Sequence, residues 1–281
     1  MTHVAKPVKI DVELAAYEPF FDHEWARKLD ALSAASKELK PIVFDLCVSW
    51  KGASSTARLP NQLMHMFNNF AIGFFKDTAP NTRSLKLVTG LTERLAKRLP
   101  LSDDMQRRVK KEMLDIDAEI RAGLENAPLP FSAEKAWLDF LHLAEFRHCL
   151  WASQRICYVA VYNAYEDFVA RSTGVAIGQV PYRMPQARAF KKEFESVFGV
   201  DLLKLCWLDH PVAIARLARH ALSHAGGRLT QELRDYRPHH GLDIETGELQ
   251  IKATDTRQLF DHLKDRVFAL VEKAIPMPNF Q

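Results

Sequence analysis

Several residue types and patterns that mark common classes of protein are scarce or missing in this chain. There are 4 cysteines in 281 residues and none forms a C-x-x-C pair, which argues against a disulfide-stapled domain, a zinc finger and a redox motif. Because they lie among apolar residues, we expect reduced core thiols in a cytoplasmic protein at Cys47, Cys149, Cys157 and Cys206. The longest uncharged stretch, residues 59–75, is too short and too polar to cross a bilayer. The first residues carry no apolar segment of the kind that a secretory signal needs.

The chain also lacks an excess of one charge. It has 38 Lys and Arg against 35 Asp and Glu, so the formal net charge is only +3. Bulk charge therefore does not hold this protein on nucleic acid, and any RNA must be bound at a local site. No P-loop, dinucleotide-binding fingerprint or nucleophile elbow is present.

Glycine is scarce as well, at 11 residues, and long stretches lack turn residues, which predicts an all-α fold. Ser102 begins a helix with a regular apolar stripe, and the proline-containing segment 126–130 ends it. This segment is the predicted domain boundary. It separates an N-terminal helical region of unknown role, residues 1–126, from a helical bundle domain, residues 131–281.

Turn and cap residues divide the second domain into further elements. The predicted helices are 132–150, 153–171 ending at Thr173-Gly174, 186–198 with Gly199 as its C-cap, one from Asp209-His210-Pro211 to Gly226-Gly227, and 256–274. Alternating residues on both sides of Thr246-Gly247 predict a small β-hairpin over 242–251.

Ionisable side chains crowd the end of the helix that begins near Pro211. Arg219 offers a planar cation suited to phosphate, and His224 offers an imidazole suited to general acid–base work. Such a pair is sufficient for metal-free phosphodiester cleavage in RNA, which supplies its own 2′-hydroxyl. Five residues separate them by about 140° around an ideal helix. They converge only if the helix end unwinds or a second copy of the chain faces the first. The alternative is that both merely stabilise the helix dipole.

Arg219-x-x-x-x-His224 followed by two glycines resembles the R-x(4–6)-H motif of HEPN domains (higher eukaryotes and prokaryotes nucleotide-binding). The helix around residues 158–168 is similar to the family's helix with an aromatic and acidic core, and the order of elements over 131–281 also fits. The resemblance implies a helical bundle that forms a homodimer, with a composite site across the twofold axis. Catalytic members are metal-independent endoribonucleases, common in toxin–antitoxin and antiviral defence systems.

Carried over to this sequence, the resemblance implies that Arg219 binds the scissile phosphate and His224 is the general acid–base. The accompanying substrate-binding residues are His220, Arg216, Ser223 and Glu166. RNA is then the substrate, no metal or cofactor is needed, and an antitoxin or regulatory protein is a further partner. His220 and Ala225 stand where Asn or Asp and Asn, respectively, are more frequent.

Glu166 is expected as a half-buried carboxylate that pairs with Arg219 or Arg216, either as a structural ion pair or as part of the site. Some HEPN members are catalytically silent, so the alternative function is a non-catalytic module that binds RNA, a nucleotide or a partner protein. A metal site built from His220, His224 and the pair His239-His240 is a weaker alternative.

Overall fold

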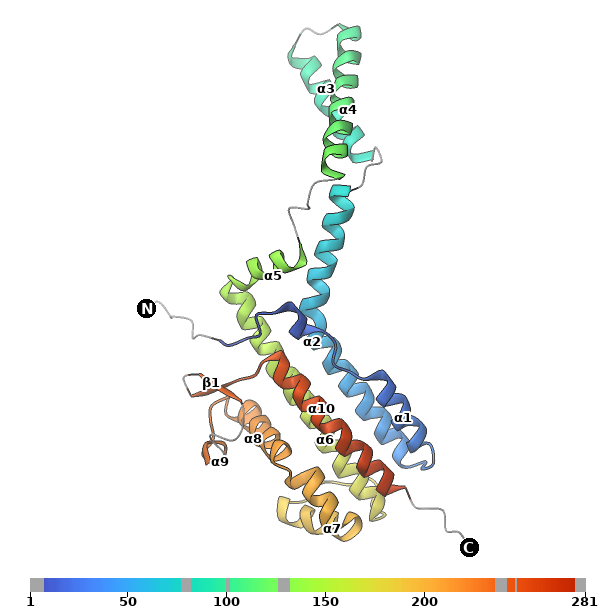
Figure 1. The fold of residues 1–281 in the computed structure, drawn as a ribbon, viewed down its shortest axis with the longest axis vertical. Coiled ribbons are helices and arrows are strands. Elements are labelled where there is room, and N and C mark those ends of the chain that lie inside the picture. The colour runs from blue at the N-terminus through green and yellow to red at the C-terminus, as the bar shows by residue number, and fades with distance from the viewer. Residues whose placement is uncertain are drawn as a thin grey trace. The chain divides into compact units, whose positions relative to one another are not determined.

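Helices make up most of the computed structural model, which describes residues 8–76, 82–99, 102–125, 132–235, 242–245 and 247–275 (Figure 1). The predicted all-α fold class is confirmed. The elements are η1 (Leu14–Tyr17), α1 (His23–Ser33), α2 (Leu39–Lys76), α3 (Thr82–Arg98), α4 (Asp103–Glu125), α5 (Ala133–Leu141), α6 (Ala144–Ala176), α7 (Ala187–Leu203), η2 (Lys204–Leu208, a π-helical turn), α8 (His210–His224), α9 (Gln231–Asp235), β1 (Asp243–Glu245), β2 (Glu248–Gln250) and α10 (Ala253–Ala274).

The chain divides into two compact units, and the division differs from the predicted boundary at 126–130. One unit joins Met1–Asn61 to Phe140–Gln281, and the other is Gln62–Asp139. The first 61 residues group with the C-terminal part because α1 and α2 supply large apolar side chains to its core. The segment 126–130 itself lies outside the described residues.

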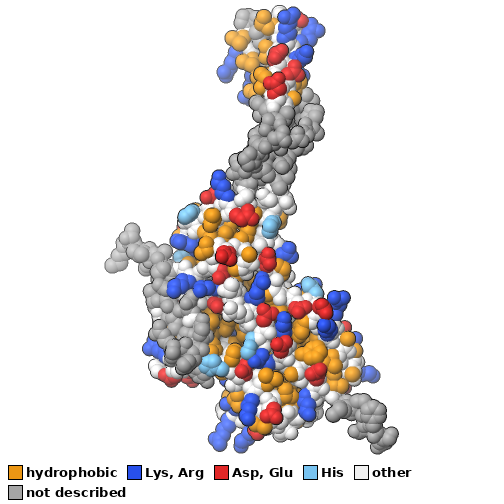
Figure 2. Space-filling model, viewed as in Figure 1, with side chains coloured by type: hydrophobic (Ala, Val, Ile, Leu, Met, Phe, Trp, Pro, Cys, Tyr) orange, Lys and Arg blue, Asp and Glu red, His pale blue; other side chains and the backbone are white. Residues whose placement is uncertain are grey.

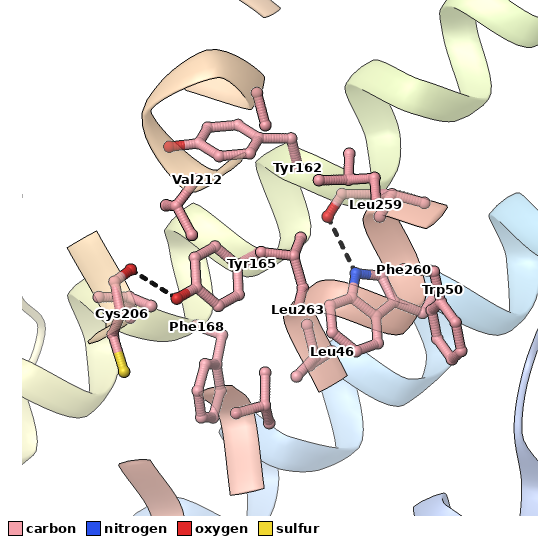
Figure 3. Close-up of a cluster of buried hydrophobic side chains, with 14 of the residues drawn as sticks. Leu46, Trp50, Tyr162, Tyr165, Phe168, Cys206, Val212, Leu259, Phe260 and Leu263 are labelled. Atoms are coloured by element: carbon pink, nitrogen blue, oxygen red, sulfur yellow. Dashed lines mark hydrogen bonds between the residues drawn. The ribbon is translucent and has the colours of Figure 1, made fainter. Parts of the chain in front are cut away.

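The core of the first unit is aromatic, and it lies between α6, α10 and the helices beside them (Figures 1 and 3). Trp50 on α2 is fully buried, meets the ring of Phe260 on α10 edge to face, and donates its Nε1–H to the carbonyl of Val161 on α6 at 2.9 Å. Tyr165 donates its hydroxyl to the carbonyl of Cys206 at 2.6 Å. These bonds satisfy buried polar groups and fix α6 at the centre of the unit.

α6 is longer than predicted at both ends: the predicted helix 132–150 is interrupted at residues 142–143, α6 begins at Ala144, and it runs without interruption through Thr173-Gly174. A Cβ at Gly174 would collide with the Tyr182 side chain, so this glycine serves a close approach between segments and does not end the helix. The Thr173 hydroxyl donates a hydrogen bond to the carbonyl of Val169, four residues earlier in the same helix, at 2.8 Å.

Other predicted elements are confirmed by the structure. Asp209 precedes α8, and Pro211 lies in its first turn. Gly199 leaves the helical region with φ 84°, although the chain turns helical again directly after it. The hairpin pairs β1 with β2 in the antiparallel sense, with Ile244 opposite Leu249.

The second unit contains the pair α3 and α4, which lie side by side (Figure 1). Among the described side chains of α3, Val88 and Thr92 are buried. Ser102 caps α4 by accepting a hydrogen bond from the Met105 backbone, as predicted. Basic side chains occur in the last part of α3 and the first half of α4, and most of them are exposed: Arg94, Lys97, Arg98, Arg107, Arg108, Lys110 and Lys111.

The cysteines follow the prediction only in part. Cys157 and Cys206 are buried, and burial raises the pKa of these thiols to about 11 and about 12, so both stay protonated at neutral pH. Cys149, however, is exposed. Across the described ranges, no helix combines the length and the apolar character that a membrane span requires.

Candidate functional site

The guanidinium of Arg219 on α8 is held by the carboxylate of Glu166 on α6 through an ion pair between Nη2 and Oε2. The two side chains are 21% and 20% exposed, so the pair is mostly screened from solvent. The predicted pairing of Glu166 is thereby confirmed for Arg219. The guanidinium also lies 5.8 Å from the ring of Tyr162, and its Nε atom is buried without a hydrogen-bond partner within the described ranges.

Arg216, a predicted substrate-binding residue, makes its contacts with Trp207. Its Nη1 donates to the carbonyl of Trp207 at 3.2 Å, and the guanidinium lies 4.8 Å from the Trp207 ring. These contacts attach the middle of α8 to the π-helical turn before the helix. Arg216 is close enough to Tyr162 to lower the pKa of that phenol, but burial raises this pKa more strongly.

His220 and His224 are both exposed and share one face of α8, with their ring centroids 4.9 Å apart. The helix remains regular up to His224, and the chain leaves it only at Ala225. The helix end therefore does not unwind, and no hydrogen bond or ring contact joins Arg219 to His224 in the part of the chain that the structure describes. Of the two routes by which these groups could meet, only the one through a second copy of the chain is left.

The glycine pair after the motif forms a tight turn that is tied to the hairpin. Gly226 and Gly227 have φ 63° and 90°, and the Gly227 N–H donates to the Ala221 carbonyl at 2.9 Å. The Gly227 carbonyl accepts from the Leu249 N–H at 2.8 Å. A Cβ at Gly227 would collide with the guanidinium of Arg155, whereas one at Gly226 would meet nothing within 4 Å. Its backbone angle therefore favours glycine at 227, and a Cβ there would also displace the Arg155 guanidinium.

An open groove of about 470 Å³ lies between α6 and the last turn of α8, and we call it the α6–α8 groove. Its lining residues are Ala152, Arg155, Ile156, Val159, Ala160, Asn163, Leu222 and Ser223. Ser223, a predicted substrate-binding residue, lies on its wall beside His224. Arg155 and Asn163 were not predicted. In the sequence, the groove residues of α6 are marked only by being three or four residues apart. Every face of a helix has this spacing, so it does not identify a site.

Charge on the remaining surface is mixed. Figure 2 shows Lys and Arg interspersed with Asp and Glu over the face in view. Within the described ranges, no group of three or more His, Cys, Asp or Glu is arranged to hold a metal ion. His239 and His240, named above as ligands in the weaker metal alternative, lie outside those ranges.

Comparison of the chain with protein-family models, with curated proteins and with solved structures gives no significant match. The resemblance to HEPN domains therefore rests on the sequence residues quoted above alone.

Proposed function

We propose that the chain is a metal-independent endoribonuclease of the HEPN type that cleaves RNA as a homodimer. The observation that supports it most is the placement of Arg219, which Glu166 holds mostly buried, directly before His220 and five residues before His224, both of which are exposed. A fixed cation suits the scissile phosphate, and exposed imidazoles suit proton transfer. The proposed setting is a toxin–antitoxin or antiviral defence system, with an antitoxin or regulatory protein as partner.

In the proposed reaction, one imidazole takes the proton of the 2′-hydroxyl as the 2′ oxygen attacks phosphorus. The bond from phosphorus to the 5′ oxygen breaks, and a second imidazole gives a proton to that oxygen, so a 2′,3′-cyclic phosphate and a 5′-hydroxyl form. We assign the proton transfers to His224 with His220, and the stabilisation of the charged phosphoryl oxygens to Arg219. Because α8 is regular, His224 reaches a phosphate held by Arg219 only from a second copy of the chain.

The test is incubation of the purified protein with mixed cellular RNA in the presence of EDTA. We expect cleavage by the unaltered protein, and a loss of about a hundredfold or more for Arg219→Ala and for His224→Ala. His142→Ala is the matched control, because His142 is also exposed but lies outside α8. Cleavage that survives both substitutions in α8, or that EDTA abolishes, contradicts the proposal.

A non-catalytic module that binds RNA, a nucleotide or a partner protein is the second candidate function. It is favoured by the ion pair itself, because Glu166 already compensates the charge of Arg219 and joins two core helices. This candidate predicts binding without turnover, and binding that His224→Ala leaves unchanged. The same RNA incubation separates the two functions.

A further inference from the structure

The α6–α8 groove continues the line of contact that holds the Arg219–Glu166 pair. On α6, Asn163 lies three residues before Glu166, and on α8, Ser223 lies four residues after Arg219. Residues at these spacings share one face of a helix. The groove therefore begins beside the pair and leads away along α6 to Arg155, about 16 Å from Glu166 at the helical rise per residue.

The lining of the groove combines two kinds of surface. Its apolar part consists of Ala152, Ile156, Val159, Ala160 and Leu222. Arg155, Asn163 and Ser223 add a cation and hydrogen-bonding groups. Its volume lies in the range of small-ligand sites. A ligand that matches this lining has an apolar face, hydrogen-bonding groups and a negative charge, and a nucleotide unit has all three.

Arg155 is held in place before any ligand binds. Its guanidinium stacks 4.3 Å from the ring of Trp151, and it occupies the space that the missing Cβ leaves at Gly227. Burial lowers the pKa of Arg155, and the charge of Glu248 acts in the opposite direction. Since Arg155 packs under the turn that follows His224, its cation has a fixed position relative to the motif, which reduces the entropy lost on binding.

We infer that the α6–α8 groove is a subsite for a nucleotide of single-stranded RNA beside the scissile bond. The base lies on the apolar part around Ile156, and the phosphate lies at Arg155. The attraction between the Arg155 cation and a phosphate favours RNA over an apolar peptide as the occupant. The inference rests on the proposed ribonuclease function for the position of the scissile phosphate, but binding in the groove does not require turnover.

The experiment measures binding of a labelled ten-nucleotide oligouridine by fluorescence anisotropy, with His224→Ala as the parent so that the RNA stays intact. Arg155→Gln removes the cation, and we expect about tenfold weaker binding and a salt dependence whose slope falls by about 0.7. Ala152→Leu fills the groove from an exposed position and should also weaken binding. Ala176→Leu is the matched control, since it makes the same change at an exposed site about 36 Å farther along α6.

A second arm adds unlabelled uridine monophosphate as competitor, which should compete far more weakly than unlabelled oligouridine. The inference is overturned if the parent does not bind oligouridine, if both groove variants bind like Ala176→Leu, or if the mononucleotide competes as well as the RNA. Cleavage by the unaltered protein is recorded in parallel. Groove-dependent binding without any cleavage leaves the subsite in place and contradicts the ribonuclease. If Arg155→Gln and Ala152→Leu, made in the unaltered protein, do not slow its cleavage, the subsite alone is contradicted.

Discussion

The two ends of α8 carry polar clusters of similar composition but different completeness. At its start, Asp209 Oδ2 accepts hydrogen bonds from Arg266 Nη2 at 2.6 Å and Nε at 3.1 Å, and lies 2.5 Å from His262 Nε2. Arg266 Nη1 also donates to the His262 carbonyl at 2.5 Å. The side chains of Asp209 and His262 are 27% exposed and that of Arg266 is 12% exposed. Each group at this end has a protein partner.

At the other end of α8, the imidazoles of His220 and His224 are exposed, and the contact that each makes there is with the other ring. Arg219 has Glu166 as partner through Nη2, while its Nε remains without one in the described ranges. Satisfied polar clusters fix a fold, whereas exposed and unsatisfied donors are available to a ligand. The comparison therefore assigns His262 to the stability of the first unit and His224 to the candidate site.

The largest expected effect is on stability, from Asp209→Ala. The substitution leaves the mostly buried guanidinium of Arg266 and the ring of His262 without their acceptor, and we expect the free energy of unfolding to fall by about 3 kcal/mol. The free energy of unfolding is measured by urea denaturation. Asp167→Ala is the control, because Asp167 is 61% exposed in its ion pair with Arg171 and should lose less than about 1 kcal/mol. Equal losses in the two variants would contradict a stabilising role of the Asp209 cluster.

The next effect concerns the two glycines that follow the motif. Gly226→Ala should lower the free energy of unfolding by about 1 kcal/mol, because the only cost is the positive φ at this position. Ala at Gly227 has the same backbone cost and also collides with Arg155, so we expect a loss of about 2 kcal/mol or more. Thermal unfolding of the two variants measures the difference. Similar melting temperatures would show that Arg155 moves aside freely and is not fixed under the turn.

A smaller effect is expected from pH. Burial raises the pKa of Asp209, but the hydrogen bonds from His262 and Arg266 outweigh it and lower this pKa overall. Because the folded-state pKa lies below the unfolded-state value of about 3.9, the carboxylate stabilises the fold fully above that value. This stability is lost as the pH falls from about 4 through the folded-state pKa.

The measurement is the free energy of unfolding between pH 5 and pH 3, for the unaltered protein and for Asp209→Asn. The variant should lose stability less steeply as the pH falls, by up to about 1.4 kcal/mol per pH unit. Some dependence should remain, because the backbone N–H of Trp25 lowers the pKa of Asp22 in the same direction. An identical slope in both proteins would exclude Asp209 as a source of acid lability.

Local patterns in the sequence predict the elements around the candidate site, and tertiary contacts decide the rest. Pro211 in the first turn of α8, the glycine pair at its end and the alternation around Thr246-Gly247 are signals within a few residues, and the structure follows them. The end predicted for α6 at Gly174 is wrong, because this glycine accommodates Tyr182 from a later segment. No local pattern distinguishes the two uses of glycine.

Local sequence patterns also do not predict that the first 61 residues group with the C-terminal part. It depends on contacts such as the hydrogen bond from Trp25 Nε1 to the Lys264 carbonyl at 3.2 Å, between residues far apart in the chain. In the site, the sequence predicts Glu166 as a half-buried carboxylate that pairs with Arg219 or Arg216, because it lies in a run of aromatic and aliphatic residues. The groove could not be predicted from the sequence, because the position of Arg155 depends on its contacts with Trp151 and Gly227 in the folded chain.

The smallest expected effect tests the comparison most directly. It compares the stability lost on removing one histidine from the polar cluster at each end of α8: His262 of α10, which contacts the start of α8, and His224 at its other end. His262→Ala removes a partner of Asp209 and should cost about 1 kcal/mol of unfolding free energy, whereas the exposed His224→Ala should stay within about 0.5 kcal/mol of the unaltered protein. Urea denaturation of the two variants under one condition measures both. If His224→Ala destabilises the fold as much as His262→Ala, the end of α8 is itself structural, and lost RNA cleavage in that variant would then report unfolding. If its stability is unchanged, lost cleavage reports the chemistry of the imidazole.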